Sequence, residues 1–219
     1  MSSETESPET EPADHHAAPL ADEARHAEKM KKKKAVRDRM MEGKTIEKGL
    51  LIVHTGKGKG KSTAAFGMLF RALGHGMPVA VVQFVKGAMD TGETKALAAF
   101  GDLAEVHRLG EGFTWETQDR QRDIAAARRA WEVAKRLIAG GERRIVLLDE
   151  LNIVLRYDYL PLDEVLAFLA TEKPEDVHVV VTGRNAPDAL IETADLVTEM
   201  EMIKHPFRSG VKAQIGIEF

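Results

Sequence analysis

The sequence of 219 residues is 43% apolar, carries a net charge of -4 and contains no cysteine. Its length and apolar content allow one well-packed core, and the charge argues against a general nucleic-acid binder. The absence of cysteine excludes disulfides, thiolate metal sites and a cysteine nucleophile, and no apolar run approaches the roughly 18 residues of a membrane span. Because the N-terminus also lacks an apolar signal core, we expect a cytoplasmic protein with no membrane partner.

The first 47 residues divide into an acidic part and a basic part. Residues 1–28 carry eight acidic side chains and three prolines but almost no large apolar residue, a composition that predicts a disordered tail. Residues 29–47 are rich in lysine and arginine, which is typical of a solvated helix. Because Met30, Val36, Met40 and Met41 would give such a helix one weakly apolar side, the alternative is an arm or lid that folds over a bound anion or a neighbouring subunit.

The segment from Leu50 to Thr63 predicts a phosphate-binding site. An apolar run that favours a strand is followed by a glycine-rich loop, and an alanine-rich helix is expected to begin near Gly60. Glycines at alternate positions let the backbone N–H groups turn inward, and the start of the helix adds its positive dipole end. The loop residues expected to bind the phosphates of ATP are Gly56, Lys57, Gly58, Lys59, Gly60, Lys61, Ser62 and Thr63.

Two loop residues have distinct expected roles, and the loop has an unusual length. Lys61 is expected to neutralise phosphate charge, and the Ser62 hydroxyl to bind a Mg²⁺ (or Mn²⁺) ion held by the phosphates. The common pattern is glycine, four residues, then Gly-Lys-Ser/Thr, and here Thr55 stands where the first glycine belongs. Either Thr55 replaces that glycine or Gly56 opens a loop that is one residue shorter. The simpler alternative, a lysine-rich surface turn, is disfavoured by the flanking strand and helix.

Strand and helix patterns alternate over the rest of the chain. Apolar runs predict strands, and apolar residues at three- and four-residue steps predict helices. We expect strands at 49–54, 78–85, 104–109, 144–150 and 177–182, helices at 61–73, 118–139, 160–170 and 187–193, and extended chain at 195–203. The tail after Gly210 alternates like an edge strand or a loop laid over the sheet. This order predicts a three-layer α/β domain of the P-loop NTPase-like (RecA-like) type with a mostly parallel sheet.

Polar residues follow several of these strands, at the sheet edge where parallel sheets bind ligands. Asp149 and Glu150 end one strand, and a carboxylate in that place beside a phosphate loop commonly holds Mg²⁺. The alternative for Asp149 is a helix cap. Arg184 follows the strand at 177–182, where its guanidinium could reach phosphate oxygens. A polar loop is expected around residues 86–93, after the strand at 78–85.

Residues 110–117 form a glycine-flanked stretch that contains two aromatic side chains, Phe113 and Trp115. Neither belongs to the apolar face of the helix that follows. Exposed aromatic rings near the nucleotide edge indicate a flat, apolar second ligand, whereas a generic nucleotide hydrolase has no use for them. The alternative is a loop that covers its own sheet.

The chain resembles the corrinoid adenosyltransferases of the phosphate-loop type. The resemblance covers about Gly49 to Phe219 and leaves out the acidic tail. It rests on six segments in this order: Thr55–Thr63, Gly112–Gln118, Leu148–Asn152, Thr182–Arg184, Ala194–Met200 and Lys204–Phe207.

The resemblance implies that the chain transfers the 5′-deoxyadenosyl group of ATP to the cobalt of a reduced corrinoid, with triphosphate as the leaving group. The reaction belongs to adenosylcobalamin biosynthesis or salvage. In this family Lys61 would stabilise the charge that develops on the triphosphate, and Ser62 and Glu150 would bind the metal ion. Phe113 and Trp115 match aromatic residues that pack below the corrin and displace its lower axial ligand.

The resemblance also implies a homodimer, a possible flavoprotein reductant and an adenosyltransferase domain at residues 48–219. Residues 29–47 match the place of a basic helix that can cover the corrinoid site of its own or a partner subunit. Two other functions compete with this one. A regulatory or binding ATPase would release orthophosphate, and a corrinoid carrier without enzymatic activity would have no need of Lys61.

Overall fold

The computed structural model describes residues 17–85, 91–110 and 119–218. By its internal contacts the chain separates into two compact units, Met1–Ile46 and Glu47–Phe219. In the described ranges, no helix is both long enough and apolar enough to cross a membrane.

In the described part of the N-terminal unit, the chain forms one long helix, α1 (Ala17–Glu42). The helix begins inside the acidic segment for which composition predicted disorder, so that expectation is wrong from Ala17 onward. Residues 17–28 contain five alanines, the residue with the highest helix propensity, and this local preference outweighs the charge. An ion pair of 2.7 Å between Glu28 and Lys32, one helical turn apart, adds a small contribution.

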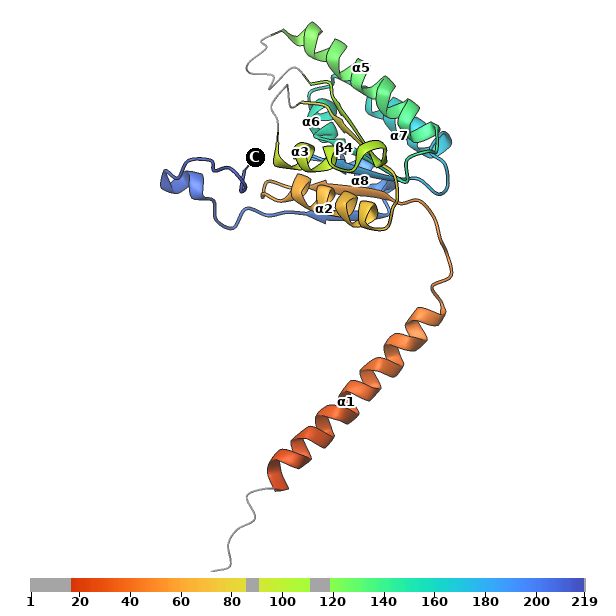
Figure 1. Cartoon of the computed structure of the whole chain (residues 1–219), viewed down its shortest axis with the longest axis vertical. Helices are drawn as coiled ribbons and strands as arrows, with labels where there is room; N and C mark the ends of the chain where they lie inside the picture. The colour runs from red at the N-terminus through yellow and green to blue at the C-terminus, as the bar shows by residue number, and fades with distance from the viewer. Residues whose placement is uncertain (1–16, 86–90, 111–118, 219) are drawn as a thin grey trace, which may run out of the picture. The chain divides into compact units, whose positions relative to one another are not determined.

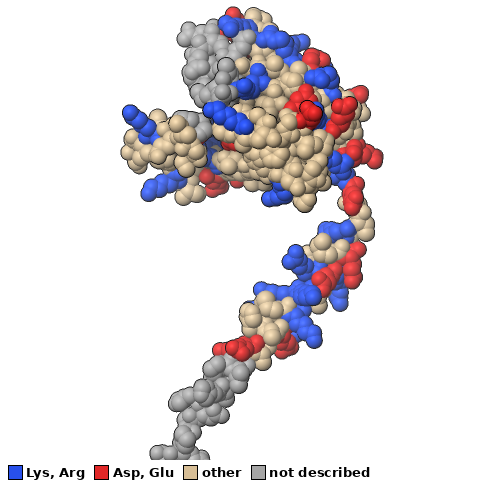
Figure 2. All heavy atoms as spheres, in the orientation of Figure 1, with Lys and Arg blue, Asp and Glu red and all other residues tan. Residues whose placement is uncertain are grey.

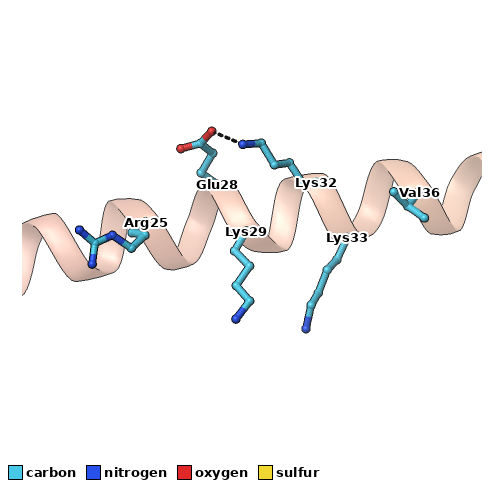
Figure 3. A pocket seen from close by; sticks show the side chains of 6 residues that line it. All are labelled: Arg25, Glu28, Lys29, Lys32, Lys33 and Val36. Carbon is cyan, nitrogen blue, oxygen red and sulfur yellow. Dashed lines mark ion pairs between the residues drawn. The ribbon is translucent and has the colours of Figure 1, made fainter.

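From residue 22 onward the side chains of α1 are exposed. Figure 2 shows lysine and arginine gathered along this helix, with acidic residues between them. The close view in Figure 3 shows Lys29 and Lys33 pointing to the same side of the helix, away from the Glu28–Lys32 pair. The depression drawn there is lined by α1 alone, because Arg25, Glu28, Lys29, Lys32, Lys33 and Val36 all belong to it. It is a shallow surface feature of one helix, unlike the cavity described below.

The C-terminal unit is built on a six-stranded sheet with strand order β3-β2-β4-β5-β1-β6, and all its strand pairs are parallel. The strands are β1 (Leu51–Thr55), β2 (Val79–Gln83), β3 (Ala104–Arg108), β4 (Ile145–Asp149), β5 (His178–Thr182) and β6 (Leu196–Glu199). Every expected strand is present with ends shifted by a few residues at most. The central strands β1, β2, β4 and β5 are almost wholly buried, as their continuous apolar runs predict.

Helices cover both faces of this sheet, which gives the three-layer α/β architecture (Figure 1). They are α2 (Lys61–Gly74), α3 (Gly92–Ala98), α5 (Arg120–Ala139), α6 (Leu151–Arg156), α7 (Leu162–Thr171) and α8 (Asp188–Thr193), with short 3₁₀ turns at Gly101–Leu103 and Pro206–Ser209.

The two faces of the sheet bury separate hydrophobic clusters because successive strand residues point to opposite sides. One cluster packs Phe66 and Leu69 of α2 against Ile52 and Val180 of the sheet. The other packs α5, α6, α7 and α8 against the alternate strand residues, with the fully buried Trp131 near its centre. The phosphate loop between β1 and α2 is therefore held by a rigid strand and a packed helix.

Two short helices were missing from the sequence-based prediction. Residues 92–98, expected to continue a polar loop, form α3, whose first turn is capped by the Thr91 hydroxyl accepting from the Thr94 N–H. Helix α6 follows β4 with Glu150 as its only intervening residue. Because α6 has six residues, its apolar pattern is too short to separate from the preceding strand by period.

The tail after Gly210 is not an edge strand. Ile215 and Ile217, which carry the alternation, are 87% and 76% exposed. The backbone instead closes a turn in which the N–H groups of Ile217 and Glu218 donate to the Gln214 carbonyl, at 3.1 and 2.9 Å. Of the two expectations for this tail, a loop is the correct one.

Two side chains fix the entry of the chain into β1. The N–H of Leu50 donates to Nδ1 of His178 over 3.1 Å, and the N–H of Leu51 donates to Oδ2 of Asp195 over 2.9 Å. Nδ1 must be unprotonated to accept this bond. Burial lowers the pKa of His178, and the positive charges of Arg144 and Lys173 lower it further, against the opposing effect of Asp176.

This hydrogen bond predicts a pH-dependent stability. Because the pKa of His178 is lower in the folded chain than its ordinary value of 6.5, the unfolded chain binds more protons at this site. The stability it contributes is therefore complete above about pH 6.5 and is lost as the pH falls toward the folded pKa. His178→Asn keeps an acceptor that does not titrate. Its free energy of unfolding in urea should fall less than that of the parent between about pH 6.5 and 5.5, and parallel curves would contradict this account.

Candidate active site

The phosphate loop begins at Gly56. Thr55 is the last residue of β1, pairs with Glu199 of β6, and accepts a hydrogen bond of 3.0 Å from the Ala186 N–H through its hydroxyl. It is thus part of the sheet and does not replace a loop glycine. Gly56 has a φ of 95°, which a residue with a Cβ rarely adopts. The second expectation, a loop opened by Gly56 and one residue shorter than usual, agrees with this geometry.

The loop lies directly on the segment that follows β6. The N–H of Gly58 donates to the Met200 carbonyl over 2.6 Å, and a Cβ on Gly58 would come within 2.4 Å of the Glu201 carbonyl oxygen. A Cβ on Gly56 would meet Met200 in the same way, at 2.5 Å from its carbonyl oxygen. These glycines are therefore required by close approach of two backbone segments as well as by the turn itself.

Lys61, the first residue of α2, is buried beneath the loop and donates through Nζ to the Gly58 carbonyl. Burial lowers its pKa, and the positive charges of Arg184 and Lys59 lower it further, while Glu150 opposes them. An ammonium group held among other cations gains free energy when an anion arrives. Lys61 is therefore placed and charged for binding phosphate.

Asp149, at the end of β4, is the centre of a buried hydrogen-bond network. Its Oδ1 accepts from the hydroxyls of Ser62 and Thr182, both at 2.8 Å, and its Oδ2 accepts from Nε2 of Gln83 at 2.9 Å. It is wholly buried and caps no helix. The donors come from α2, β5 and β2, which meet at the carboxyl edge of the parallel sheet.

This network favours Asp149 as the carboxylate next to Ser62, whereas the family resemblance assigned the metal ion to Glu150. Glu150 follows Asp149 in the left-handed region, with a φ of 64°, and its N–H donates to the Thr182 hydroxyl over 3.0 Å. Its side chain lines the cavity described next. Asp149 had the same sequence signal as Glu150. Only the spatial position of Ser62 distinguishes the two carboxylates.

A cavity of about 870 Å³ opens over the phosphate loop. The phosphate loop, the start of α2, α3, α6 and the tail all line it. The lining residues are Gly58, Lys59, Gly60, Lys61, Ser62, Thr63, Phe70, Val85, Thr91, Gly92, Glu93, Ala96, Glu150, Ile153, Arg156, Tyr157, Arg184, Gly216, Ile217 and Glu218. Arg184, expected to reach phosphates, is among them, whereas Gly56 and Lys57 are not.

The tail contacts the phosphate loop through an ion pair between Glu218 and Lys59. Glu218 is largely shielded from solvent, with 16% of its side chain exposed. The tail, dark blue in Figure 1, thus brings the end of the chain to the nucleotide cavity. No sequence pattern indicated this contact, because the two residues lie at opposite ends of the domain.

Phe113 and Trp115 lie outside the described residues, but the chain on either side is placed. The N–H groups of Leu109 and Gly110 both donate to the Gln83 carbonyl at 3.2 Å, at the same edge of the sheet as Asp149. On the other side, Asp119 caps α5 by accepting from the N–H groups of Gln121 and Arg122.

The fold and this site define a P-loop, NTPase-like nucleotide-binding domain: a parallel sheet, a glycine loop leading into a helix, a buried lysine and a strand-end aspartate bonded to the loop serine. The family model for ATP:corrinoid adenosyltransferase BtuR/CobO/CobP matches residues 47–219. The chain belongs to this family.

Corrinoid adenosyltransferases from three bacteria are similar to the chain over most of its length. The protein of Sinorhizobium sp is 65% identical, covering 90% of this chain and 93% of its own. That of Pseudomonas aeruginosa is 56% identical, covering 89% and 96%, and that of Escherichia coli K12 is 49% identical, covering 79% and 87%. The chain is therefore an enzyme that transfers the adenosyl group of ATP to a corrinoid, and the alternative of a regulatory ATPase is not favoured.

Proposed function

We propose that the reaction is a substitution at carbon, in which the cobalt of a corrinoid reduced to Co(I) attacks C5′ of ATP. The cobalt supplies the electron pair of the new cobalt–carbon bond. The bond between C5′ and the α-phosphate oxygen breaks, and its electron pair leaves with intact triphosphate. The observation that carries this proposal is the position of Lys61 and Ser62 at the floor of a cavity whose volume suits a small-molecule site.

This reaction needs no side-chain acid or base, because no proton moves. Catalysis then consists of holding the two substrates in line and stabilising the charge that develops on triphosphate. Lys61 supplies positive charge from within the loop, and Arg184 supplies it from the cavity wall. Loop N–H groups and the start of α2 add further donors.

We also propose that Ser62 and Glu150, which line the cavity, would hold a Mg²⁺ or Mn²⁺ ion with the triphosphate, with Asp149 supporting Ser62 from behind. The donors are a hydroxyl and a carboxylate, the oxygen ligands that these ions prefer. When bound, the ion would neutralise charge on the leaving group. The Ser62 hydroxyl donates a hydrogen bond to Asp149, so its oxygen lone pairs remain available to a ligand. Asp149 thus prepares Ser62 as a ligand.

The reaction is tested anaerobically with the full chain, ATP, Mg²⁺ and chemically reduced cob(I)alamin. The expected result is the spectrum of light-sensitive adenosylcobalamin and one triphosphate for each product molecule. Release of orthophosphate without a change in the corrinoid spectrum would contradict the proposal.

The roles of Phe113 and Trp115 are proposed from the family resemblance. Their rings would displace the lower axial ligand, which makes Co(II) easier to reduce, and would exclude water from the reduced metal. Trp115→Ala should therefore slow the reaction from cob(II)alamin with a reductant far more than the reaction from pre-reduced cob(I)alamin. Phe207→Ala, which removes a 78% exposed ring from the tail, is the matched control. Equal losses in the two assays of Trp115→Ala would limit the ring to binding.

On the same family resemblance we propose that the protein is a homodimer and that a flavoprotein supplies the reducing electron. We also propose a cytoplasmic location. The basic helix α1 is the proposed cover of the corrinoid site. Its exposed Met40 and Met41, 63% and 59% accessible, provide apolar surface for such a contact.

A further inference from the structure

Gln83, the last residue of β2, has no role in the function described so far. In the sheet register it lies beside Asp149 of β4 and Arg108 of β3. Its side chain is 1% exposed, which is unusual for glutamine unless its amide is engaged. It therefore occupies a buried polar position directly behind the proposed metal-binding residues.

The amide orientation of Gln83 is fixed by its partner. A carboxylate oxygen only accepts, so the group 2.9 Å from Oδ2 of Asp149 must be the Nε2 donor. Oε1 of Gln83 then points elsewhere, and among the described residues it has no hydrogen-bond partner. A buried acceptor without a partner destabilises the fold. Such a cost is typical of a site whose remaining partner arrives with the substrate.

Three described side chains donate hydrogen bonds to the two oxygens of Asp149. Ser62 and Thr182 occupy Oδ1, and Gln83 occupies Oδ2. Without Gln83 one of the described donors to the carboxylate is lost, and the group could swing about its terminal bond away from its present plane. The Ser62 proton would then no longer have one fixed acceptor, and its lone pairs would no longer have one fixed direction.

We propose that Gln83 is a positioning residue for the metal–triphosphate site. Its Nε2 orients Asp149, which orients the Ser62 hydroxyl, and its Oε1 would be available to a donor that arrives with the substrate. This inference rests on the proposed function, because it assigns Gln83 a role in the same metal site.

The test is the affinity for Mn²⁺ in the presence of ATP, followed by electron paramagnetic resonance of the free ion. Gln83→Met keeps the length of the side chain and removes both polar atoms. We expect Mn²⁺ to bind about 10- to 100-fold more weakly. At saturating metal the KM for cob(I)alamin should not change, because the backbone carbonyl that accepts from Leu109 and Gly110 is retained. Gln121→Met, on the exposed start of α5, is the matched control.

A double-mutant cycle separates positioning from general destabilisation. If Gln83 acts through Asp149, Gln83→Met should weaken Mn²⁺ binding much less in an Asp149→Asn background than in the parent. Unchanged Mn²⁺ affinity in Gln83→Met, with or without a lower melting temperature, would overturn the proposal. The assay of the parent chain separates the proposed reaction from the proposed role of Gln83. If the parent forms adenosylcobalamin and Gln83→Met binds Mn²⁺ normally, the role of Gln83 is refuted and the reaction is not.

Discussion

Lys61→Ala is expected to reduce triphosphate formation by at least about 100-fold, the usual effect of removing one group that stabilises charge in a transition state. The side chain is buried, lines the cavity and donates to the Gly58 carbonyl of the phosphate loop. Its loss removes charge where the leaving triphosphate develops it. The measurement is single-turnover formation of triphosphate from ATP and cob(I)alamin.

The comparison variant is Lys57→Ala in the same loop. Lys57 is exposed and does not line the cavity, so its removal should cost much less than that of Lys61. Circular dichroism would verify that both variants keep the fold. Retained turnover in Lys61→Ala would remove the loop from the mechanism. Equal losses of turnover in Lys61→Ala and Lys57→Ala would mean that the total positive charge of the loop is important and the position of Lys61 is not.

Asp149→Asn is expected to weaken binding of Mg²⁺ in the presence of ATP by about 10- to 100-fold and to lower turnover at limiting metal. Both carboxylate oxygens accept hydrogen bonds, so the amide nitrogen of an asparagine must face a donor whichever way it turns. At least one bond is lost together with the negative charge. The measurement is turnover as a function of Mg²⁺ concentration.

Asp102→Asn, in the exposed 3₁₀ turn at Gly101–Leu103, makes the same chemical change away from the site. It should leave the Mg²⁺ dependence as in the parent. If Asp149→Asn also kept that dependence, Glu150 and Ser62 alone would account for the metal site and the network would be structural.

Much of the fold follows from local sequence. The buried strands read as continuous apolar runs because both faces of a parallel sheet are covered, and α5 reads as a helix because one apolar face repeats over twenty residues. Short helices, and a helix that begins in a segment of mixed composition, were less predictable. The six-residue α6 merges with β4, and the helical start of α1 at Ala17 depends on alanine propensity within an acidic composition.

The candidate site also has features that the sequence predicted and features that it did not. The phosphate loop, Lys61, Ser62 and Arg184 could be predicted, because glycine spacing and strand ends are properties of neighbouring residues. The ion pair of Glu218 with Lys59 could not, since it joins residues far apart in the sequence.

By itself the sequence determined the class of site: a glycine loop after a buried strand binds phosphate wherever it folds, because the donors are its own backbone N–H groups. Only the tertiary structure showed which carboxylate is hydrogen-bonded to the serine of that loop. Asp149 and Glu150 are adjacent in sequence and equal in charge. The fold brings the side chains of Gln83, Thr182 and Ser62 to the Asp149 carboxylate, because a carboxylate is oriented by donors from neighbouring elements and not by its own segment.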